Sequence, residues 1–224
     1  MERHFDEELA GLKKDIIGMG SMVEKAIEKS IEALKQLSRE QAAQVIADDR
    51  AVDELEVSID RRCVDLLALR QPMANDLRFI TMAMEIATDL ERMADLAVDI
   101  AQRVLELAGK PLLKPLVDIP ALTGIAKEMT RDVIRAFVES DAALARRVIE
   151  RDREADLLRN RIQSELVNDY MVKQCDTVPR AIPLLLIARH LERICDHCTN
   201  IGEDIIFMVE AKMVKHRPES PFAG

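Results

Sequence analysis

The 224-residue chain contains two motifs that each occur twice, with the two copies separated by roughly half of the sequence. Val45-Ile46-x-x-Asp49-Arg50-x-x-Asp53 recurs as Val148-Ile149-x-x-Asp152-Arg153-x-x-Asp156. Leu90-Glu91-Arg92-x-x-Asp95 recurs as Leu191-Glu192-Arg193-x-x-Asp196. Because self-similarity at a fixed period is typical of repeated structural units, the sequence predicts an internal duplication in which both halves share one fold.

Composition indicates that both halves are helical. Only 3% of the residues are aromatic, Trp is absent, and the chain has just 7 Gly and 8 Pro. Residues that favour strands and turns are therefore scarce, whereas the strong helix formers Ala, Leu, Glu, Arg and Met are abundant. This composition disfavours β-sandwiches, β-barrels and doubly wound α/β folds.

Each half contains three long stretches of helical periodicity, bounded by residues that start or stop helices. Ser38-Arg39-Glu40-Gln41 has the spacing of a capping box, with Ser38 as the N-cap and the Gln41 side chain reaching back. Gln71-Pro72 ends the second stretch, because the residue before a proline avoids the helical region. The expected helices cover residues 5–37, 38–69, 75–109, 121–140, 141–174 and 178–215.

Long helices joined by short turns are typical of helical bundles. We therefore predict an all-α fold with six long helices, arranged as two tandem, duplicated three-helix bundles with pseudo-two-fold symmetry. Three prolines within ten residues, Pro111, Pro115 and Pro120, indicate a linker between the bundles. The predicted domains are residues 1–108 and 121–215, with linker 109–120 between them and a flexible tail over 216–224.

The third helix of each half has apolar residues at alternating steps of four and three, which is a heptad pattern. We expect these residues to pack against neighbouring helices. At 3.6 residues per turn, the face opposite to this seam carries oxygen-bearing side chains in both halves. The seams are Ile86, Leu90, Met93, Ala97, Ile100, Val104 and Leu107, and Ile187, Leu191, Ile194, Cys198, Ile201, Ile205 and Met208.

The acidic residues opposite the seams have a spacing that favours cation binding. Carboxylates four residues apart on a helix repel one another, whereas a helix meant only to be soluble alternates acidic and basic residues. A multivalent cation would relieve this repulsion; oxygen ligands suit Mg, Mn or Ca, and carboxylate clusters also hold iron. The candidate metal ligands are Asp49, Asp53, Glu91, Asp95, Asp99, Asp152, Asp156, Glu192, Asp196 and Asn200. A simply solvated acidic face is the alternative.

Other chemical signatures are few. Cys195-Asp196-His197-Cys198 lies in mid-helix without a second ligand pair, so we predict buried core thiols rather than a zinc or redox site. His190 and His197 share a helix face and are the histidines considered for a metal site. No nucleotide-binding, serine-hydrolase or zinc-protease motif occurs, and no His has Glu three residues before it, as di-iron bundles require.

Charge and hydropathy restrict the partners. The formal net charge of −9 disfavours nucleic-acid binding, which needs a basic surface. No stretch has the length of a membrane span, and the N-terminus lacks the pattern of a secretory signal, so a cytosolic location is expected.

Four candidate classes remain: a metal-binding adaptor, a carboxylate-bridged metal hydrolase or oxidase, a purely structural helical module, and a phosphotransfer protein using His197.

Two segments of the chain resemble the PhoU family of phosphate-signalling regulators. They are Asp89-Leu-Glu-Arg-Met-Ala-Asp-Leu-Ala-Val-Asp-Ile-Ala101 and His190-Leu-Glu-Arg-Ile-Cys-Asp-His-Cys-Thr-Asn-Ile-Gly202. The stretches Arg3–Leu9 and Leu69–Arg78 are also similar to the family, so the resemblance spans residues 3 to 213.

The resemblance implies two tandem three-helix bundles with surface metal clusters on E/D-x-x-x-D motifs, which match the carboxylates named above. Fe, Zn, Mn and Mg are the candidate ions. It further implies a non-enzymatic adaptor that negatively regulates phosphate uptake and the phosphate-starvation response. Such an adaptor would contact the ATPase subunit of a phosphate ABC transporter and a phosphate sensor histidine kinase, reach the membrane only through these partners, and form a homodimer.

Overall fold

A computed structural model describes residues 2–214, and within this range the chain forms helices and no β-strand. The first half contains α1 (Glu2–Gln36), α2 (Arg39–Asp48), α3 (Arg50–Arg70) and α4 (Ala74–Leu107). The second half contains α5 (Asp118–Glu139), α6 (Ala142–Glu165) and α7 (Val178–Glu210). Between the last two lie a short π-helix, η1 (Leu166–Met171), and a short 3-10 helix, η2 (Cys175–Thr177).

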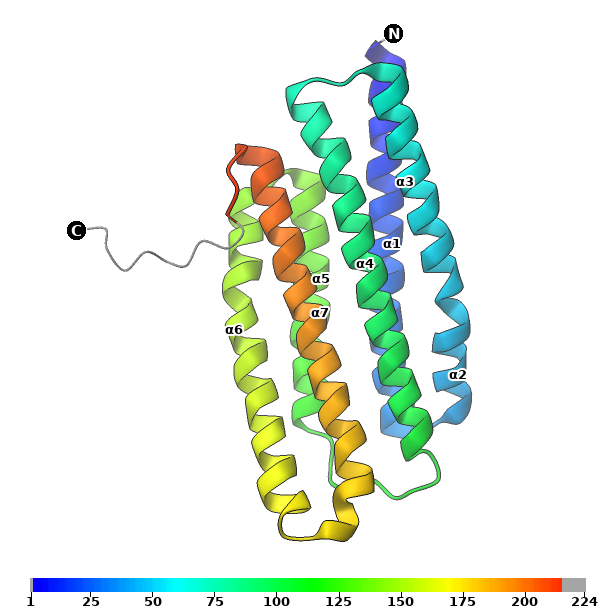
Figure 1. The fold of residues 1–224 in the computed structure, drawn as a ribbon, viewed down its shortest axis with the longest axis vertical. Coiled ribbons are helices and arrows are strands. Elements are labelled where there is room, and N and C mark those ends of the chain that lie inside the picture. The colour runs from blue at the N-terminus through cyan, green and yellow to red at the C-terminus, as the bar shows by residue number, and fades with distance from the viewer. Residues whose placement is uncertain (1, 215–224) are drawn as a thin grey trace, which may run out of the picture.

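The helices form two three-helix bundles that lie side by side (Figure 1). One bundle consists of α1, the successive helices α2 and α3, and α4, and the other consists of α5, α6 and α7. The bundles meet where α4 packs along α7 and α1 packs along α5, and α4 and α7 run in opposite directions (Figure 1). The predicted all-α fold of two duplicated three-helix bundles is confirmed.

The predicted heptad seams form the centre of the core. Every residue of both seams is buried, so the seams pack against neighbouring helices as expected. On α4, small residues outside the seam, such as Ala87 and Ala94, are buried as well, because this helix contacts both its own bundle and α7. Phe79 of α4 stacks on Phe137 of α5 with ring centroids 5.2 Å apart. One apolar core therefore continues through both bundles.

The contact between α1 and α5 depends on a glycine. A Cβ atom at Gly20 would lie 2.7 Å from Cγ1 of Ile134, which is closer than nonbonded carbon atoms approach one another. Gly18, on the same helix, has open space around the corresponding position. The two bundles can therefore approach at Gly20 only because this residue has no side chain.

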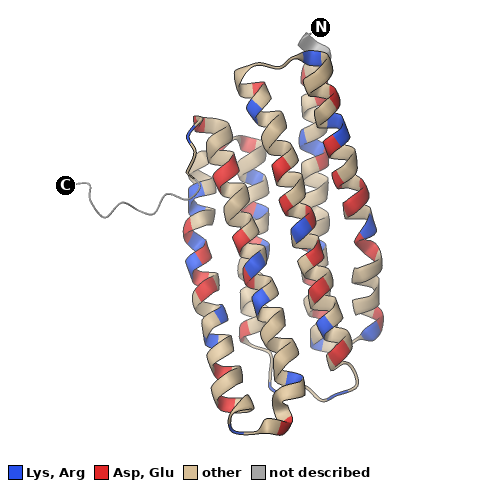
Figure 2. Ribbon diagram, in the orientation of Figure 1, with Lys and Arg blue, Asp and Glu red and all other residues tan. Residues whose placement is uncertain are grey.

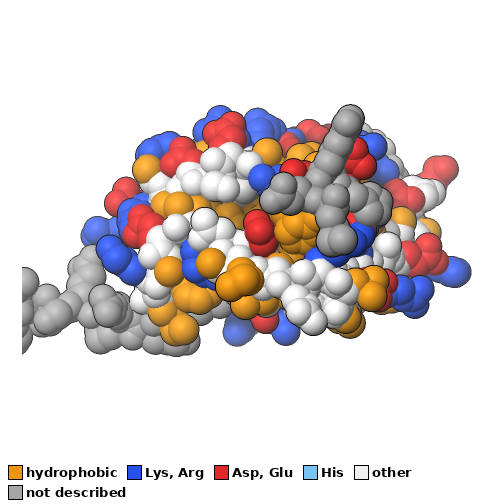
Figure 3. Space-filling view, turned by 90° about the horizontal axis from the view of Figure 1, so that it is seen from above, with side chains coloured by type: hydrophobic (Ala, Val, Ile, Leu, Met, Phe, Trp, Pro, Cys, Tyr) orange, Lys and Arg blue, Asp and Glu red, His pale blue; other side chains and the backbone are white. Residues whose placement is uncertain are grey.

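The end of the molecule where α4 begins and α7 ends is partly apolar. Hydrophobic side chains gather there between charged ones (Figure 3), and Leu9, Phe79 and Met208 line a pocket of about 430 Å³ at this end. Arg78 of α4 joins the two bundles at the same end, because its Nε donates a hydrogen bond to the carbonyl oxygen of Met208 at 3.1 Å.

Of the two hydrogen bonds of the capping box predicted at Ser38–Gln41, the structure contains one. The Oγ of Ser38 accepts a hydrogen bond from the backbone N–H of Gln41 at 3.3 Å, so Ser38 is the N-cap of α2 as predicted. The Gln41 side chain does not complete the capping box, because its Nε2 donates instead to Oε1 of Gln36 at 3.0 Å.

Two of the predicted helices are not continuous. The helix expected over 38–69 breaks at Asp49, where α2 ends and α3 begins. The dihedral angles of Asp49 remain helical, and neither Gly nor Pro marks the break, so the apolar spacing contains no sign of it. The helix expected over 141–174 is α-helical only to Glu165 and then widens into η1, and a π-helical turn keeps much the same helical pattern in the sequence.

Two boundaries also differ from the prediction. The helix α5 begins at Asp118, so residues 118–120 of the predicted linker are helical, with Pro120 in the first turn, where a proline is tolerated. The helix α7 ends at Glu210 instead of near residue 215, because Ala211 adopts a left-handed conformation with φ of 55°. The tail predicted over 216–224 lies outside the described residues. No helix within residues 2–214 is long and apolar enough to cross a membrane.

Candidate metal-binding clusters

Acidic and basic residues are distributed over both bundles (Figure 2), and the predicted metal ligands fall into two groups. The first acidic cluster lies where α3 faces α4, and it contains Asp49, Asp53, Glu91, Asp95 and Asp99. The second acidic cluster lies where α6 faces α7, and it contains Asp152, Asp156, Glu192 and Asp196. In both halves the structure therefore brings together the carboxylates of two helices, as the repeated motifs predicted.

Burial and the closeness of the carboxylates in the first acidic cluster raise the pKa values of several of them. Burial, followed by repulsion from Asp53 and Asp95, raises the pKa of Asp49 to about 6. Burial, followed by repulsion from Asp95 and then from Glu56, raises the pKa of Glu91 to about 6. Within residues 5–214, no Lys or Arg forms an ion pair with any of these five carboxylates. Their mutual repulsion is thus not relieved by a neighbouring cation of the chain.

Glu56 is an additional member of the first acidic cluster that the sequence analysis missed. Its carboxylate contributes to the raised pKa of Glu91, and its Oε1 accepts a hydrogen bond from Oγ1 of Thr88 at 3.2 Å. Its position three residues after Asp53, on the same face of α3, could have indicated that Glu56 belongs to the cluster. The duplicated motif does not extend to this position, because the second half has Arg159 there.

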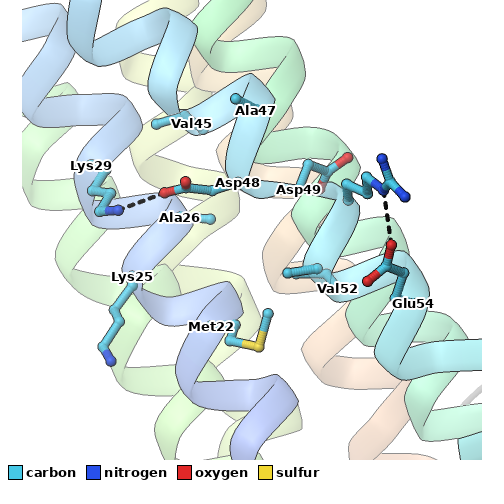
Figure 4. A pocket seen from close by; sticks show the side chains of 12 residues that line it. Met22, Lys25, Ala26, Lys29, Val45, Ala47, Asp48, Asp49, Val52 and Glu54 are labelled. Atoms are coloured by element: carbon cyan, nitrogen blue, oxygen red, sulfur yellow. Dashed lines mark hydrogen bonds and ion pairs between the residues drawn. The ribbon is translucent and has the colours of Figure 1, made fainter. Parts of the chain in front are cut away.

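Asp49 lies at the break between α2 and α3, next to an aspartate in a different environment. Figure 4 shows Asp48 pointing to Lys29 of α1 and Asp49 pointing away from it. Oδ2 of Asp48 is 2.7 Å from Nζ of Lys29, and this hydrogen bond lowers the pKa of Asp48. The Asp49 side chain caps neither helix. The break therefore separates a paired carboxylate from one that faces the other acidic residues.

The second acidic cluster is similarly crowded but partly neutralised. Burial, followed by repulsion from Asp196 and Asp156, raises the pKa of Asp152 to about 6. Its Oδ1 is buried and has no hydrogen-bond partner in the described part of the chain. In contrast to the first cluster, Arg159 places Nη2 2.8 Å from Oε1 of Glu192 and 3.7 Å from Oδ1 of Asp156. Asn200 is exposed on α7, one turn beyond Asp196.

The carboxylate oxygens of both clusters suit a hard cation in chemistry and in charge, and in the first cluster no Lys or Arg of the described residues relieves their repulsion. However, no three or more His, Cys, Asp or Glu side chains within the described residues are arranged closely enough to hold a metal ion. Binding of an ion would therefore require the carboxylates to rotate towards it. The clusters are regions of excess negative charge rather than preformed coordination shells.

The Cys195-Asp196-His197-Cys198 motif is divided between the core and the surface. Cys195 and Cys198 are completely buried, and burial raises the pKa of the Cys198 thiol to about 12. The sulfur of Cys198 lies 3.6 Å from Oγ1 of Thr130. These buried thiols confirm the prediction of core residues, because a reactive or ligating cysteine needs a lowered pKa.

The two histidines of α7 face α4 across the interface between the bundles. Nδ1 of His197 lies 2.8 Å from Oδ1 of Asp89, and both side chains are nearly buried, with exposed fractions of 13% and 10%. Nδ1 of His190 lies 3.7 Å from Oδ2 of Asp99. A phosphoryl acceptor must be accessible to its kinase, so the burial of His197 argues against the phosphotransfer alternative.

The fold and these clusters define a duplicated helical-bundle protein with an acidic surface patch on each repeat. A family model, the PhoU domain, matches the chain twice, over residues 16–104 and 119–205. The chain belongs to the PhoU family. Each match begins in the first helix of a bundle and ends near the close of its third helix, which agrees with the predicted duplication.

Individual relatives are similar over nearly the whole chain. A phosphate-specific transport system accessory protein PhoU homologue from Aquifex aeolicus is 42% identical over 211 residues, which are 94% of this chain and 95% of the relative. The crystal structure of PhoU from Pseudomonas aeruginosa matches with a TM-score of 0.88 and 32% identity, covering 93% of this chain and all of that one.

The crystal structure of the phosphate transport system regulatory protein PhoU from Streptococcus pneumoniae matches with a TM-score of 0.87 and 30% identity, covering 94% of this chain and 99% of that one. The names of these relatives describe accessory and regulatory proteins, which supports the prediction that the chain is not an enzyme.

Proposed function

We propose that the chain is an accessory protein of a phosphate-specific transport system and that it negatively regulates phosphate uptake and the phosphate-starvation response. The observation that carries this proposal is the similarity of both repeats to accessory and regulatory proteins of phosphate transport over nearly the full length.

In this role the chain acts in the cytoplasm as an adaptor between two partners, the ATPase subunit of the phosphate ABC transporter and the phosphate sensor histidine kinase. It forms a homodimer and contacts the membrane only through these partners. The two bundles lie side by side, so each has helices that face away from the other bundle (Figure 1), which suits an adaptor that binds two proteins.

The acidic clusters hold divalent or transition metal ions in the same proposal. The first cluster is the better candidate, because its carboxylates repel one another without relief from Lys or Arg in the described structure. The second cluster binds the metal ion more weakly, because Glu192 already forms an ion pair with Arg159. A bound ion supplies counter-charge and joins α3 to α4, or α6 to α7. The ligands are Asp49, Asp53, Glu91, Asp95 and Asp99 in the first cluster and Asp152, Asp156, Glu192, Asp196 and Asn200 in the second.

The adaptor role is tested in the organism that encodes the chain. Deleting the chain should switch on a reporter of the phosphate-starvation response in phosphate-rich medium, and the ATPase subunit and the kinase should co-purify with the tagged protein. A reporter that stays repressed after deletion, with neither partner recovered, would contradict the proposal.

Metal binding is tested by elemental analysis after dialysis against Mn²⁺ or Fe²⁺. We expect the wild type to retain metal and the Asp49→Asn/Asp95→Asn variant to retain much less, while the Asp48→Asn control is unchanged because Asp48 pairs with Lys29. Equal metal content in the three proteins would remove the first cluster from the proposal. Phosphatase or oxidase turnover that is lost in Asp95→Ala would favour the metalloenzyme alternative instead.

A further inference from the structure

The two repeats have diverged at one corner of their acidic clusters. Glu56 and Thr88 occupy this corner in the first half, where Thr88 donates a hydrogen bond to Glu56. The corresponding positions in the second half, obtained with the offsets of the duplicated motifs, are Arg159 and Arg189. An acidic and a neutral residue in one repeat are thus replaced by two basic residues in the other. Arg92 corresponds to Arg193, so this arginine is common to both repeats.

This corner of the second half is hollow. A pocket of about 540 Å³ opens between α6 and α7, and its lining includes Arg159 and Gln163 from α6 and Arg189 and Arg193 from α7. The apolar side chain of Leu185 contributes to the same pocket. Guanidinium groups therefore enter the pocket from both of its helical walls.

The arginines of this pocket differ in whether they pair with other residues of the protein. Arg159 is used within the protein, because its Nη2 is 2.8 Å from Oε1 of Glu192 and its Nη1 is 2.6 Å from Oδ1 of Asn160. Arg189 and Arg193 are exposed, and neither forms a hydrogen bond or an ion pair with another residue in the described range. Glu192 and Asp196 are the carboxylates that line the pocket. Since Glu192 is neutralised by Arg159, Asp196 is the one lining carboxylate without an ion pair, beside the two unpaired guanidinium groups of Arg189 and Arg193.

Guanidinium groups recognise carboxylates and phosphates, and their arrangement distinguishes between these anions. One planar guanidinium satisfies one planar carboxylate. Here Arg189 and Arg193 are one turn apart on α7, and Gln163 and Arg159 lie on the facing helix. Donors that approach from two walls suit a tetrahedral anion, whose oxygens point in different directions. The pocket is also larger than a single phosphate ion, so it accommodates a group attached to the phosphate.

We propose that the pocket between α6 and α7 binds a small phosphate-bearing anion, with Arg189 and Arg193 of α7 and Gln163 of α6 as its ligands and Arg159 as the residue that neutralises Glu192. The first half does not have this property, because Glu56 stands there in place of Arg159 and Thr88 in place of Arg189. The two repeats then differ in what they bind: the first binds the cation more strongly, and only the second binds the anion. Phosphate binding requires neither the transporter nor the kinase, so it is testable independently of the adaptor role.

The test is titration calorimetry of the intact protein in a phosphate-free buffer of low ionic strength, with EDTA present so that no metal-bridged phosphate contributes. The probes are inorganic phosphate, ATP and acetate. We expect binding of inorganic phosphate, of ATP or of both, no binding of acetate, and an affinity at least about tenfold weaker in Arg189→Gln/Arg193→Gln. Binding of inorganic phosphate identifies the free ion as a ligand, and binding of ATP alone identifies a phosphate ester.

Arg92→Gln is the matched control, because Arg92 occupies the equivalent helix position in the first repeat, and it should bind as the wild type does. Arg189→Thr, which introduces the residue found at the equivalent position of the first half, should also weaken binding. Arg189 and Arg193 are exposed, so their substitution should not unfold the protein, which circular dichroism of each variant checks. The proposal is overturned if neither phosphate compound binds, if acetate binds equally well, or if Arg92→Gln loses as much affinity as the double variant.

Discussion

Replacing Asp49 with asparagine should stabilise the protein at neutral pH. Asp49 has its pKa raised from 3.8 to about 6, first by burial and then by repulsion from Asp53 and Asp95. Each unit of a pKa shift corresponds to about 1.4 kcal/mol, so the ionised form of Asp49 costs at most about 3 kcal/mol in the folded state. Solvent screening and the favourable negative charge at the start of α3 reduce this value, and we expect a gain of about 1 kcal/mol.

The stability gained by Asp49→Asn should increase as the pH rises. A carboxyl group whose pKa is raised on folding binds more protons in the folded state, so folded stability falls as pH rises between the unfolded and the folded pKa. For Asp49 this range is from 3.8 to about 6. Urea unfolding followed by circular dichroism, in EDTA, should therefore show the variant as more stable than the wild type at pH 7.5. The difference should shrink towards zero as the pH approaches 4.

Asp48→Asn provides the adjacent control. Asp48 pairs with Lys29 at the surface, with the two side chains 46% and 53% exposed, so its loss should destabilise the protein by no more than about 0.5 kcal/mol. Added Mn²⁺ should stabilise the wild type more than Asp49→Asn if the first acidic cluster binds the ion. A neutral or destabilising effect of Asp49→Asn at pH 7.5 would refute the claim that repulsion in this cluster is unrelieved.

Three further measurements test the packing and the caps. Gly20→Ala should lower the unfolding free energy by about 1–2 kcal/mol, because its Cβ would meet α5, whereas Gly18→Ala, with open space, should raise it by about 0.5–1 kcal/mol in urea denaturation. Ser38→Ala should cost about 1 kcal/mol by removing the N-cap of α2, and an unchanged midpoint would mean that the cap contributes nothing. A thiol reagent should modify the exposed Cys175 rapidly and the three buried cysteines only on unfolding, as followed by mass spectrometry.

The features predicted correctly are those that depend on many residues at once. A heptad seam repeats its signal over seven positions, so one atypical residue, such as Cys198 in the second seam, does not hide it. The duplicated motifs then indicate that two such units exist and that their carboxylates occupy equivalent places. The facing of α3 and α4, and of α6 and α7, follows because these are the consecutive long helices that carry the acidic motifs.

The features that the sequence did not reveal depend on single residues or on long-range contacts. The break at Asp49 has no Gly or Pro, and the left-handed Ala211 that ends α7 is not a residue type that favours this conformation. The ion pair between Arg159 and Glu192 joins two helices, so neither residue alone indicates that the second cluster is partly neutralised. Which acidic cluster keeps its full negative charge therefore becomes evident only from the contacts between helices.

Divergence of the repeats also explains why the two halves dock onto each other in one particular way. His197 of α7 meets Asp89 of α4 at 2.8 Å in the buried interface. With the offset of the duplicated motif, the first-half equivalent of His197 is Leu96, and the second-half equivalent of Asp89 is His190. Two first halves joined through the same surfaces would place Asp89 opposite Leu96 and leave a buried carboxylate unpaired, which is costly. Two second halves would place His190 opposite His197. The mixed arrangement, within one chain, pairs Asp89 with His197, so this pair favours docking of the first repeat onto the second.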